Sequence, residues 1–102
     1  MKDVIPKKSL GQHWLHDEWT LSAICDAAGV QAGDTVLEVG PGLGTLTKQL
    51  LARGAKVTAV EFDDTLAANL AQNVGESHLQ DGSLTVVRED ILRFDLTTLP
   101  VG

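Results

Sequence analysis

The segment 35–47 constrains the fold of this chain more than any other part of it. A β-branched and apolar run over 35–39 leads into three glycines that are spaced by two residues. Leucines then recur at spacings of three and four, which is the period of an amphipathic helix. This order predicts a buried strand, a tight glycine turn and a helix, the first half of a βαβ unit. Glycine lets the backbone approach a ligand closely, and the helix N-terminus presents free N–H groups. We therefore expect a nucleotide-type cofactor at this turn.

The spacing of the glycines distinguishes two kinds of cofactor site. A dinucleotide fingerprint, Gly-x-Gly-x-x-Gly, would need its third glycine where this chain has Thr45. The chain instead has Glu-x-Gly-x-Gly-x-Gly from Glu38 to Gly44. This pattern resembles the first motif of the Rossmann-like methyltransferases that use S-adenosylmethionine. Because some tight strand-to-helix turns are purely structural, the rest of the chain must support the assignment.

Composition bounds the class of protein. A chain of 102 residues is at most one domain. It contains no run of 18 apolar residues, and its first residues lack the apolar core of a signal peptide. The single cysteine, Cys25, excludes an internal disulfide and a cysteine-built metal site. We therefore expect a cytoplasmic protein without a membrane span.

The charge is unevenly distributed along the chain. The net charge of −6 argues against a general nucleic-acid binder, which needs clustered Lys and Arg. Residues 1–8 hold three lysines and one aspartate, whereas residues 9–102 hold five bases and thirteen acids. The basic arm is either a contact for RNA phosphates or a solvated tail, and the sequence leaves both readings open.

The chain divides into an arm and strap, residues 1–16, and a body, residues 17–102. In the body, periodicity and turn residues predict helices over 18–28, 45–53 and 65–73, and strands over 35–39, 56–61 and 84–88. Residues 75–82 are expected to be loop. The first helix is expected to carry Trp19, Leu21, Ile24, Cys25 and Ala28 on or near one face. The fold class is α/β, with βαβαβ forming the N-terminal half of a doubly wound, Rossmann-like fold.

Two acids follow the second and third predicted strands. Glu61 lies 21 residues after Gly40, where Rossmann-type sites place a carboxylate that accepts from both ribose hydroxyls. Asp90 ends the third strand, where it could accept from the exocyclic amine of an adenine, with Ile91 as an apolar neighbour. The alternatives are an exposed strand-end acid for Glu61 and a turn cap for Asp90. Asp63 and Asp64 are expected to be helix caps.

Glu38 lies inside the first predicted strand, where a charge is costly unless it is paired. We expect it to accept N–H groups of the glycine loop or the strap, with direct contact to a cationic methionine-type tail as the alternative. No catalytic residue is assigned. His13 and His16 lack a third ligand nearby in the sequence, so no metal site is expected. Methyl transfer from a sulfonium depends on in-line placement of the two reactants, and it does not require such groups.

Together these segments resemble the ribosomal RNA adenine N6-dimethyltransferases, both the small-subunit dimethyladenosine transferases and the related erythromycin-resistance methyltransferases. Four segments carry the resemblance in family order: 8–17 (KSLGQHWLHD), 38–47 (EVGPGLGTLT), 60–63 (VEFD) and 89–92 (EDIL). The resemblance implies S-adenosylmethionine contacts at His13, Leu15, Gly40, Glu61 and Asp90. The strap departs from the family at two positions, because His13 replaces the usual Asn and Trp14 replaces the usual Phe.

The family's target-adenine motif, Asn-Leu-Pro-Tyr, does not occur in this chain. The resemblance therefore implies the cofactor-binding, N-terminal part of an enzyme whose partner is small-subunit rRNA or a pre-ribosomal particle. Without the fourth strand of such a sheet, residues 36–39 would form an open edge at which the chain could self-associate. The alternatives are a binding module that holds the cofactor without catalysis, and a nicotinamide oxidoreductase, which Thr45 and the strap disfavour.

Overall fold

The computed structural model describes residues 18–99. Its elements are α2 (Glu18–Ala28), β1 (Thr35–Val39), α3 (Thr45–Ala52), β2 (Lys56–Glu61), α4 (Asp64–Val74), α5 (Ser77–Gln80), β3 (Leu84–Arg88), and the 3-10 turns η1 (Ile91–Arg93) and η2 (Leu96–Thr98). All three predicted strands are confirmed, and the three predicted helices agree to within one residue at each end. The prediction of loop over 75–82 was wrong in part, because α5 lies within it. None of the helices in residues 18–99 is long and apolar enough to cross a membrane.

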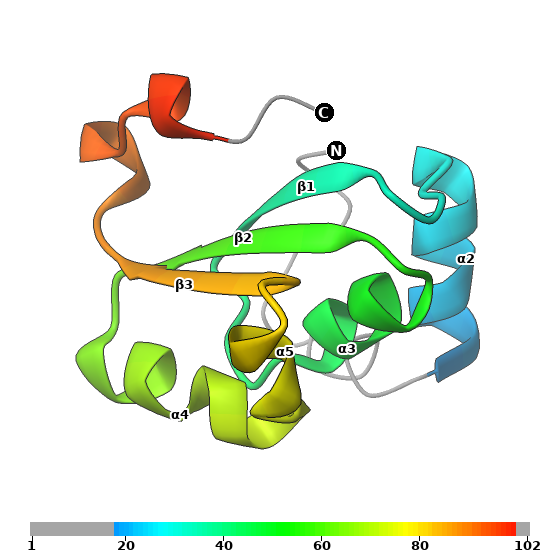
Figure 1. Ribbon diagram of the computed structural model, residues 1–102, viewed down its shortest axis with the longest axis horizontal. Coiled ribbons are helices and arrows are strands. Elements are labelled where there is room, and N and C mark those ends of the chain that lie inside the picture. The colour runs from blue at the N-terminus through cyan, green and yellow to red at the C-terminus, as the bar shows by residue number, and fades with distance from the viewer. Residues whose placement is uncertain (1–17, 100–102) are drawn as a thin grey trace.

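The three strands form a parallel sheet in the order β1-β2-β3. Figure 1 shows α3, α4 and α5 on one side of this sheet, with α2 beside α3. The hydrophobic core lies between the sheet and these helices. Its buried members are Cys25, Leu50, Leu51, Ala55, Val57, Ala59, Leu70, Val74 and Leu84. Because consecutive strands are parallel, all their carboxyl ends lie at one edge of the sheet, and this is the edge at which the glycine loop begins.

The first helix buries fewer of its predicted residues than expected. Leu21, Ile24 and Cys25 are buried, but Ala28 is exposed and Trp19 is 78% exposed. The face that was predicted to carry these five residues is therefore buried in its middle and exposed at the two ends of the helix. The buried residues Leu21, Ile24 and Cys25 follow one another at spacings of three and one, which forms a narrow apolar stripe in the middle of the helix.

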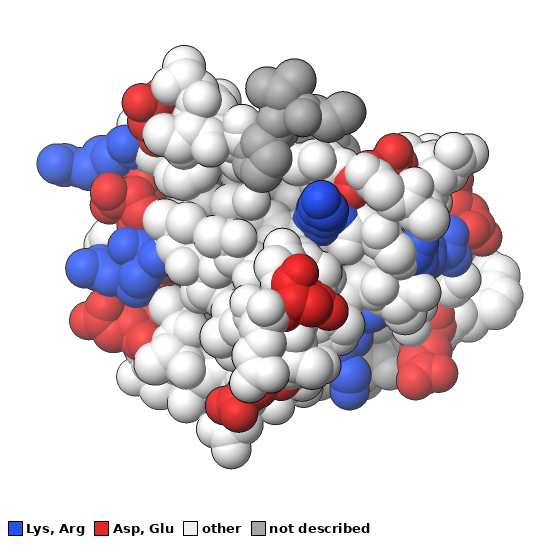
Figure 2. All heavy atoms as spheres, viewed as in Figure 1, with Lys and Arg blue, Asp and Glu red and all other residues white. Residues whose placement is uncertain are grey.

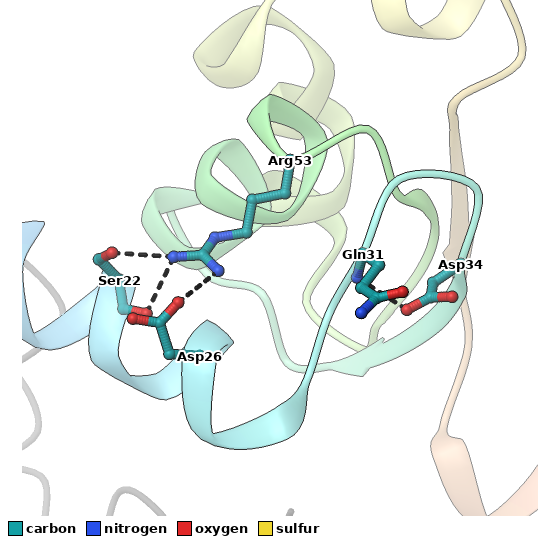
Figure 3. Close-up of polar contacts among 5 residues, drawn as sticks. All are labelled: Ser22, Asp26, Gln31, Asp34 and Arg53. Atoms are coloured by element: carbon teal, nitrogen blue, oxygen red, sulfur yellow. Dashed lines mark hydrogen bonds and ion pairs between the residues drawn. The ribbon is translucent and has the colours of Figure 1, made fainter.

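Polar contacts fix α2 against the end of α3 (Figure 3). The Arg53 guanidinium donates to the Asp26 carboxylate over 2.7 Å and to the carbonyl and hydroxyl oxygens of Ser22 over 3.1 and 2.9 Å. In the following turn, the backbone N–H of Gln31 donates to Asp34 over 2.8 Å. These contacts lie at the amino ends of the strands. They hold the helices in place at the edge opposite the glycine loop.

Candidate functional site

The glycine loop connects β1 to α3 at the carboxyl edge of the sheet. Its three glycines all have positive φ: Gly40 at 68°, Gly42 at 61° and Gly44 at 89°. The loop has two parts with different surroundings. We call residues 40–43 the open half, because a Cβ added at Gly40 or Gly42 would meet no atom within 4 Å. We call residues 44–47 the packed half, because Gly44 and Thr47 are buried.

Gly44 explains why the packed half needs a glycine. A Cβ at this position would lie 2.5 Å from Val74 Cγ1 and 2.8 Å from Leu70 Cδ1, both on α4. The missing side chain therefore lets the start of α3 lie directly against α4. Gly44 is also the N-cap residue of α3 and offers no side-chain cap, so the first N–H groups of this helix receive no acceptor from it. The packed half thus combines close helix packing with the positive end of a helix dipole.

Glu61 holds the open half in place. Its side chain is only 7% exposed, and its two carboxylate oxygens accept from the backbone N–H of Gly42 over 3.1 Å and of Asp63 over 3.0 Å. A carboxylate can accept about four hydrogen bonds, so these two leave capacity for further donors. The sequence placed Glu61 at the correct strand end, but its attachment to the loop is visible only in the structure.

Glu38 differs from the sequence-based expectation. It was expected to accept N–H groups of the loop or strap; it accepts from the Thr47 hydroxyl over 2.5 Å, the loop N–H donates to Glu61 instead, and the strap lies outside the described residues. The reason is the position of each acid along the sheet: Glu38 shares a row with the core residues Ala59 and Val86, whereas Glu61 lies two residues beyond Ala59, at the end of β2 where the loop passes. Burial raises the pKa of Glu38 to about 7, and the hydrogen bond from Thr47 opposes this rise.

Gly40 and Asp90 have their own partners within the chain. The N–H of Gly40 donates to the Val60 carbonyl over 2.9 Å, so this amide is committed to the sheet. The Oδ1 atom of Asp90 accepts from the N–H of Leu92 over 3.0 Å and caps η1. This is the turn cap that the sequence offered as the alternative role, and it leaves the Oδ2 atom without a partner among residues 18–99. Asp63 caps α4 as expected, through Leu66 N at 2.9 Å.

Exposed apolar side chains gather around the same edge. Val39, Leu43 and Phe62 follow or border the ends of β1 and β2, and each is more than half exposed. Leu92, after β3, is 89% exposed. The carboxyl edge therefore combines hydrogen-bonding carboxylates with apolar surface, a composition typical of sites for a small organic ligand. The predicted strap contacts, His13 and Leu15, lie outside the described residues.

A shallow hollow of about 330 Å³ lies at the opposite edge, lined in part by Lys56, His78, Asp81 and Ser83. Its polar groups pair with one another. Asp81 accepts from both the N–H and the hydroxyl of Ser83, and His78 Nδ1 lies 3.0 Å from the same hydroxyl. The hydrogen bonds from Ser83 hold the pKa of Asp81 below its usual value. This cluster closes the turn before β3. Among residues 18–99, no three His, Cys, Asp or Glu side chains gather to hold a metal ion.

Solved structures that resemble this chain include methyltransferases. The 23S rRNA methyltransferase ErmE matches 78% of this chain with a TM-score of 0.64 and 34% identity, over 31% of its own chain. The glycopeptide N-methyltransferase MtfA, solved with S-adenosyl-L-methionine, matches 74% of this chain with a TM-score of 0.60 and 27% identity, over 34% of its own chain. The fold is therefore the N-terminal half of a Rossmann-like methyltransferase fold.

Sequence comparison gives a closer relation. The ribosomal RNA small subunit methyltransferase A of Mycobacterium tuberculosis is 53% identical over 104 residues, which cover 98% of this chain. The chain spans 33% of the length of that relative. The family model "Ribosomal RNA adenine dimethylase" matches residues 5–100. Since this match includes the glycine loop and both strand-end acids, the chain belongs to the ribosomal RNA adenine dimethylase family.

Proposed function

We propose that this chain is the cofactor-binding part of an S-adenosylmethionine-dependent enzyme that dimethylates N6 of adenines in small-subunit rRNA. The observation that carries the proposal is the buried Glu61 carboxylate, held beside the open half of the glycine loop. The N–H groups of Gly42 and Asp63 fix its two carboxylate oxygens in position and leave lone pairs for two hydroxyl donors. A ribose diol presents such a pair of hydroxyls.

The other carboxyl-edge residues fit the rest of an adenosyl cofactor. The Oδ2 atom of Asp90, which has no partner in the part of the chain that the structure describes, is available to the exocyclic amine of the adenine, and the exposed Phe62 and the half-buried Ile91 offer apolar surface to its ring. Gly40 has open space where a side chain would be, so the cofactor can approach its backbone, but its N–H is already donated to Val60. His13 and Leu15 are proposed to close the site from the strap. When bound, the cofactor supplies an electrophilic methyl group on its sulfonium, and the residues described here bind and orient it.

The remaining parts of the activity are proposed for the whole protein. Several solved or curated relatives are named as rRNA methyltransferases. Figure 2 shows acidic and basic side chains interspersed on the face in view, without a continuous basic patch among the described residues. We therefore assign most contacts with rRNA, or with a pre-ribosomal particle in the cytoplasm, to regions beyond this cofactor-binding part.

Calorimetric titration of S-adenosylmethionine into the 102-residue chain tests the cofactor assignment, with NADH as the ligand control. We expect saturable binding of the first ligand alone. Glu61→Ala should weaken binding about a hundredfold, because two hydrogen bonds to a charged acceptor are lost. Glu76→Ala is the matched control, since Glu76 is an exposed glutamate away from the carboxyl edge that makes no side-chain cap. Binding of NADH, or unchanged binding by Glu61→Ala, would contradict the proposal. A longer chain that binds cofactor but transfers no methyl group would favour a pure binding module.

Self-association is proposed for the edge strand β1. Lys56 N donates to the Asp34 carbonyl and Gly40 N donates to the Val60 carbonyl, so the alternating backbone groups of Leu37 and Val39 point away from β2. Among residues 18–99 no other strand pairs with β1. Sedimentation velocity over a range of concentrations should show association in the wild-type chain and less in Leu37→Lys. A monomer at all concentrations would contradict this part of the proposal.

A further inference from the structure

Glu38 is a buried carboxyl group for which the proposed cofactor contacts give no role. It is the penultimate residue of β1, two residues before the open half of the loop, and it is 8% exposed. Its hydrogen bond from Thr47 joins β1 to the first turn of α3, so the glycine loop is closed at its base by this pair. Because the loop connects β1 to α3, a change in the charge of Glu38 acts directly on both of these elements.

The surroundings of Glu38 do not neutralise a negative charge. In the sheet it lies beside Ala59, and α3 contributes the Thr47 hydroxyl. From α2, the titratable neighbour is the buried Cys25, whose thiol pKa is raised chiefly by burial and, to a smaller extent, by the charge of Glu38. Within residues 18–99, the two ion pairs join Arg53 to Asp26 and Arg88 to Asp64, and neither includes Glu38.

A buried acid without a cation takes up a proton near neutral pH, because burial disfavours its charged form. Burial raises the pKa of Glu38 to about 7, so the protonated and ionised forms coexist in the free protein. The Glu61 carboxylate, at the end of β2, accepts from the backbone N–H groups of Gly42, in the open half, and of Asp63. The free loop is thus flanked by one carboxylate with backbone donors and one carboxyl group that lacks them.

We propose that Glu38 is a positioning residue that couples binding of the cationic methyl donor to release of a proton. This inference rests on the proposed function. S-adenosylmethionine brings a sulfonium to the loop, whereas the product, S-adenosylhomocysteine, has lost that charge. A cation above the loop favours the ionised form of Glu38, and the proton leaves to the solvent. Ionised Glu38 then binds the Thr47 hydroxyl more strongly, which tightens the base of the loop around the donor.

The first test needs no ligand. Carbon-detected NMR of the glutamate carboxyl groups in the free 102-residue chain should show one resonance that titrates near neutral pH, and Glu38→Gln should remove it. Glutamine keeps the shape of the side chain and its acceptor oxygen for Thr47, but it cannot titrate. If every glutamate finishes its titration below about pH 5.5, the proposal is overturned.

The second test measures protons directly. Titrations of S-adenosylmethionine at pH 7 in phosphate and in Tris buffer, which differ in ionisation enthalpy, give the number of protons released on binding. We expect about half a proton from the wild type, because about half of the free protein is protonated at that pH, and none from Glu38→Gln. S-adenosylhomocysteine should release fewer protons than the donor does. The donor affinity of the wild type should rise severalfold from pH 6 to pH 8, and that of Glu38→Gln should stay constant.

The outcomes separate this inference from the proposed function. If the donor binds and both chains release the same number of protons, the coupling is wrong and the cofactor assignment stands. If neither the donor nor the product binds to the wild type or to Glu38→Gln, the cofactor assignment for this chain fails, and the coupling fails with it. A purely structural role for Glu38 would change affinity in Glu38→Gln without changing the proton count.

Discussion

The two halves of the glycine loop use the same residue type for different purposes. In the open half, Gly42 faces empty space and donates its N–H to Glu61. In the packed half, Gly44 has Val74 and Leu70 of α4 where its side chain would be. The open half thus leaves its backbone accessible, whereas the packed half holds helices together. A glycine repeat therefore identifies the turn, but it does not say which glycines serve the ligand.

The carboxyl groups beside the two halves, Glu61 and Glu38, also differ in their surroundings. Glu61 and Glu38 are almost equally buried, at 7% and 8% exposure. Glu61 has two backbone N–H donors, whereas Glu38 has one hydroxyl donor and a pKa raised to about 7 by burial. Equal burial therefore leads to different chemistry, because the number and kind of donors decide how well a buried charge is stabilised.

The largest effect is expected for a methyl group in the packed half. Gly44→Ala should lower the free energy of unfolding by about 4 kcal/mol, since it combines left-handed backbone strain with overpacking against α4. Gly42→Ala is the matched control in the open half, where strain alone should cost about 1 kcal/mol. Urea denaturation of both variants measures the difference. Equal losses would mean that the two halves do not differ in packing.

The second largest effect concerns the buried charge of Glu38. The raised pKa means that Glu38 ionises first in the unfolded chain, so its contribution to stability is greatest below pH 4.5 and is lost as the pH rises through about 7. At pH 8 the cost reaches about 3 kcal/mol. Glu38→Gln should remove it, so the variant should exceed the wild type in stability at pH 8 but not at pH 4. Urea denaturation at the two pH values measures this, and a variant less stable at pH 8 would contradict it.

These same residues show which features the sequence alone predicts. Periodicity located every strand, and the count from Gly40 placed Glu61 at its strand end. The exchange of partners between Glu38 and Glu61 was not predictable, because it depends on how the loop folds back over the end of β2. Residues 77–80 form a single helical turn, which is too short to produce a periodic pattern. Trp19 looked like a core residue by type, but its place in the first turn of α2 leaves it exposed.

The third effect belongs to the open half. Glu61→Ala should cost about 2 kcal/mol of unfolding free energy, because the N–H groups of Gly42 and Asp63 lose their acceptor and are partly reached by water. Glu61→Gln, which keeps one acceptor oxygen, should lose about half as much. Urea denaturation gives both values, and hydrogen exchange at Gly42 should become faster in Glu61→Ala. Unchanged exchange at Gly42 would show that Glu61 does not hold this half of the loop.

The smallest effect tests the hydroxyl that joins the packed half to β1. Thr47→Val removes the donor to Glu38 and keeps the shape of a fully buried side chain. The hydrogen bond stabilises the ionised carboxylate, so its loss should raise the pKa of Glu38 further. The variant should lose about 1 kcal/mol at pH 8 and less at pH 5, whereas Thr47→Ser should stay close to the wild type at both. In a Glu38→Gln background the loss should no longer depend on pH, because no carboxylate remains to be stabilised. If the loss of unfolding free energy kept its pH dependence in that background, Thr47 would act on another titrating group. The contrast between the two halves would then have a different electrostatic origin.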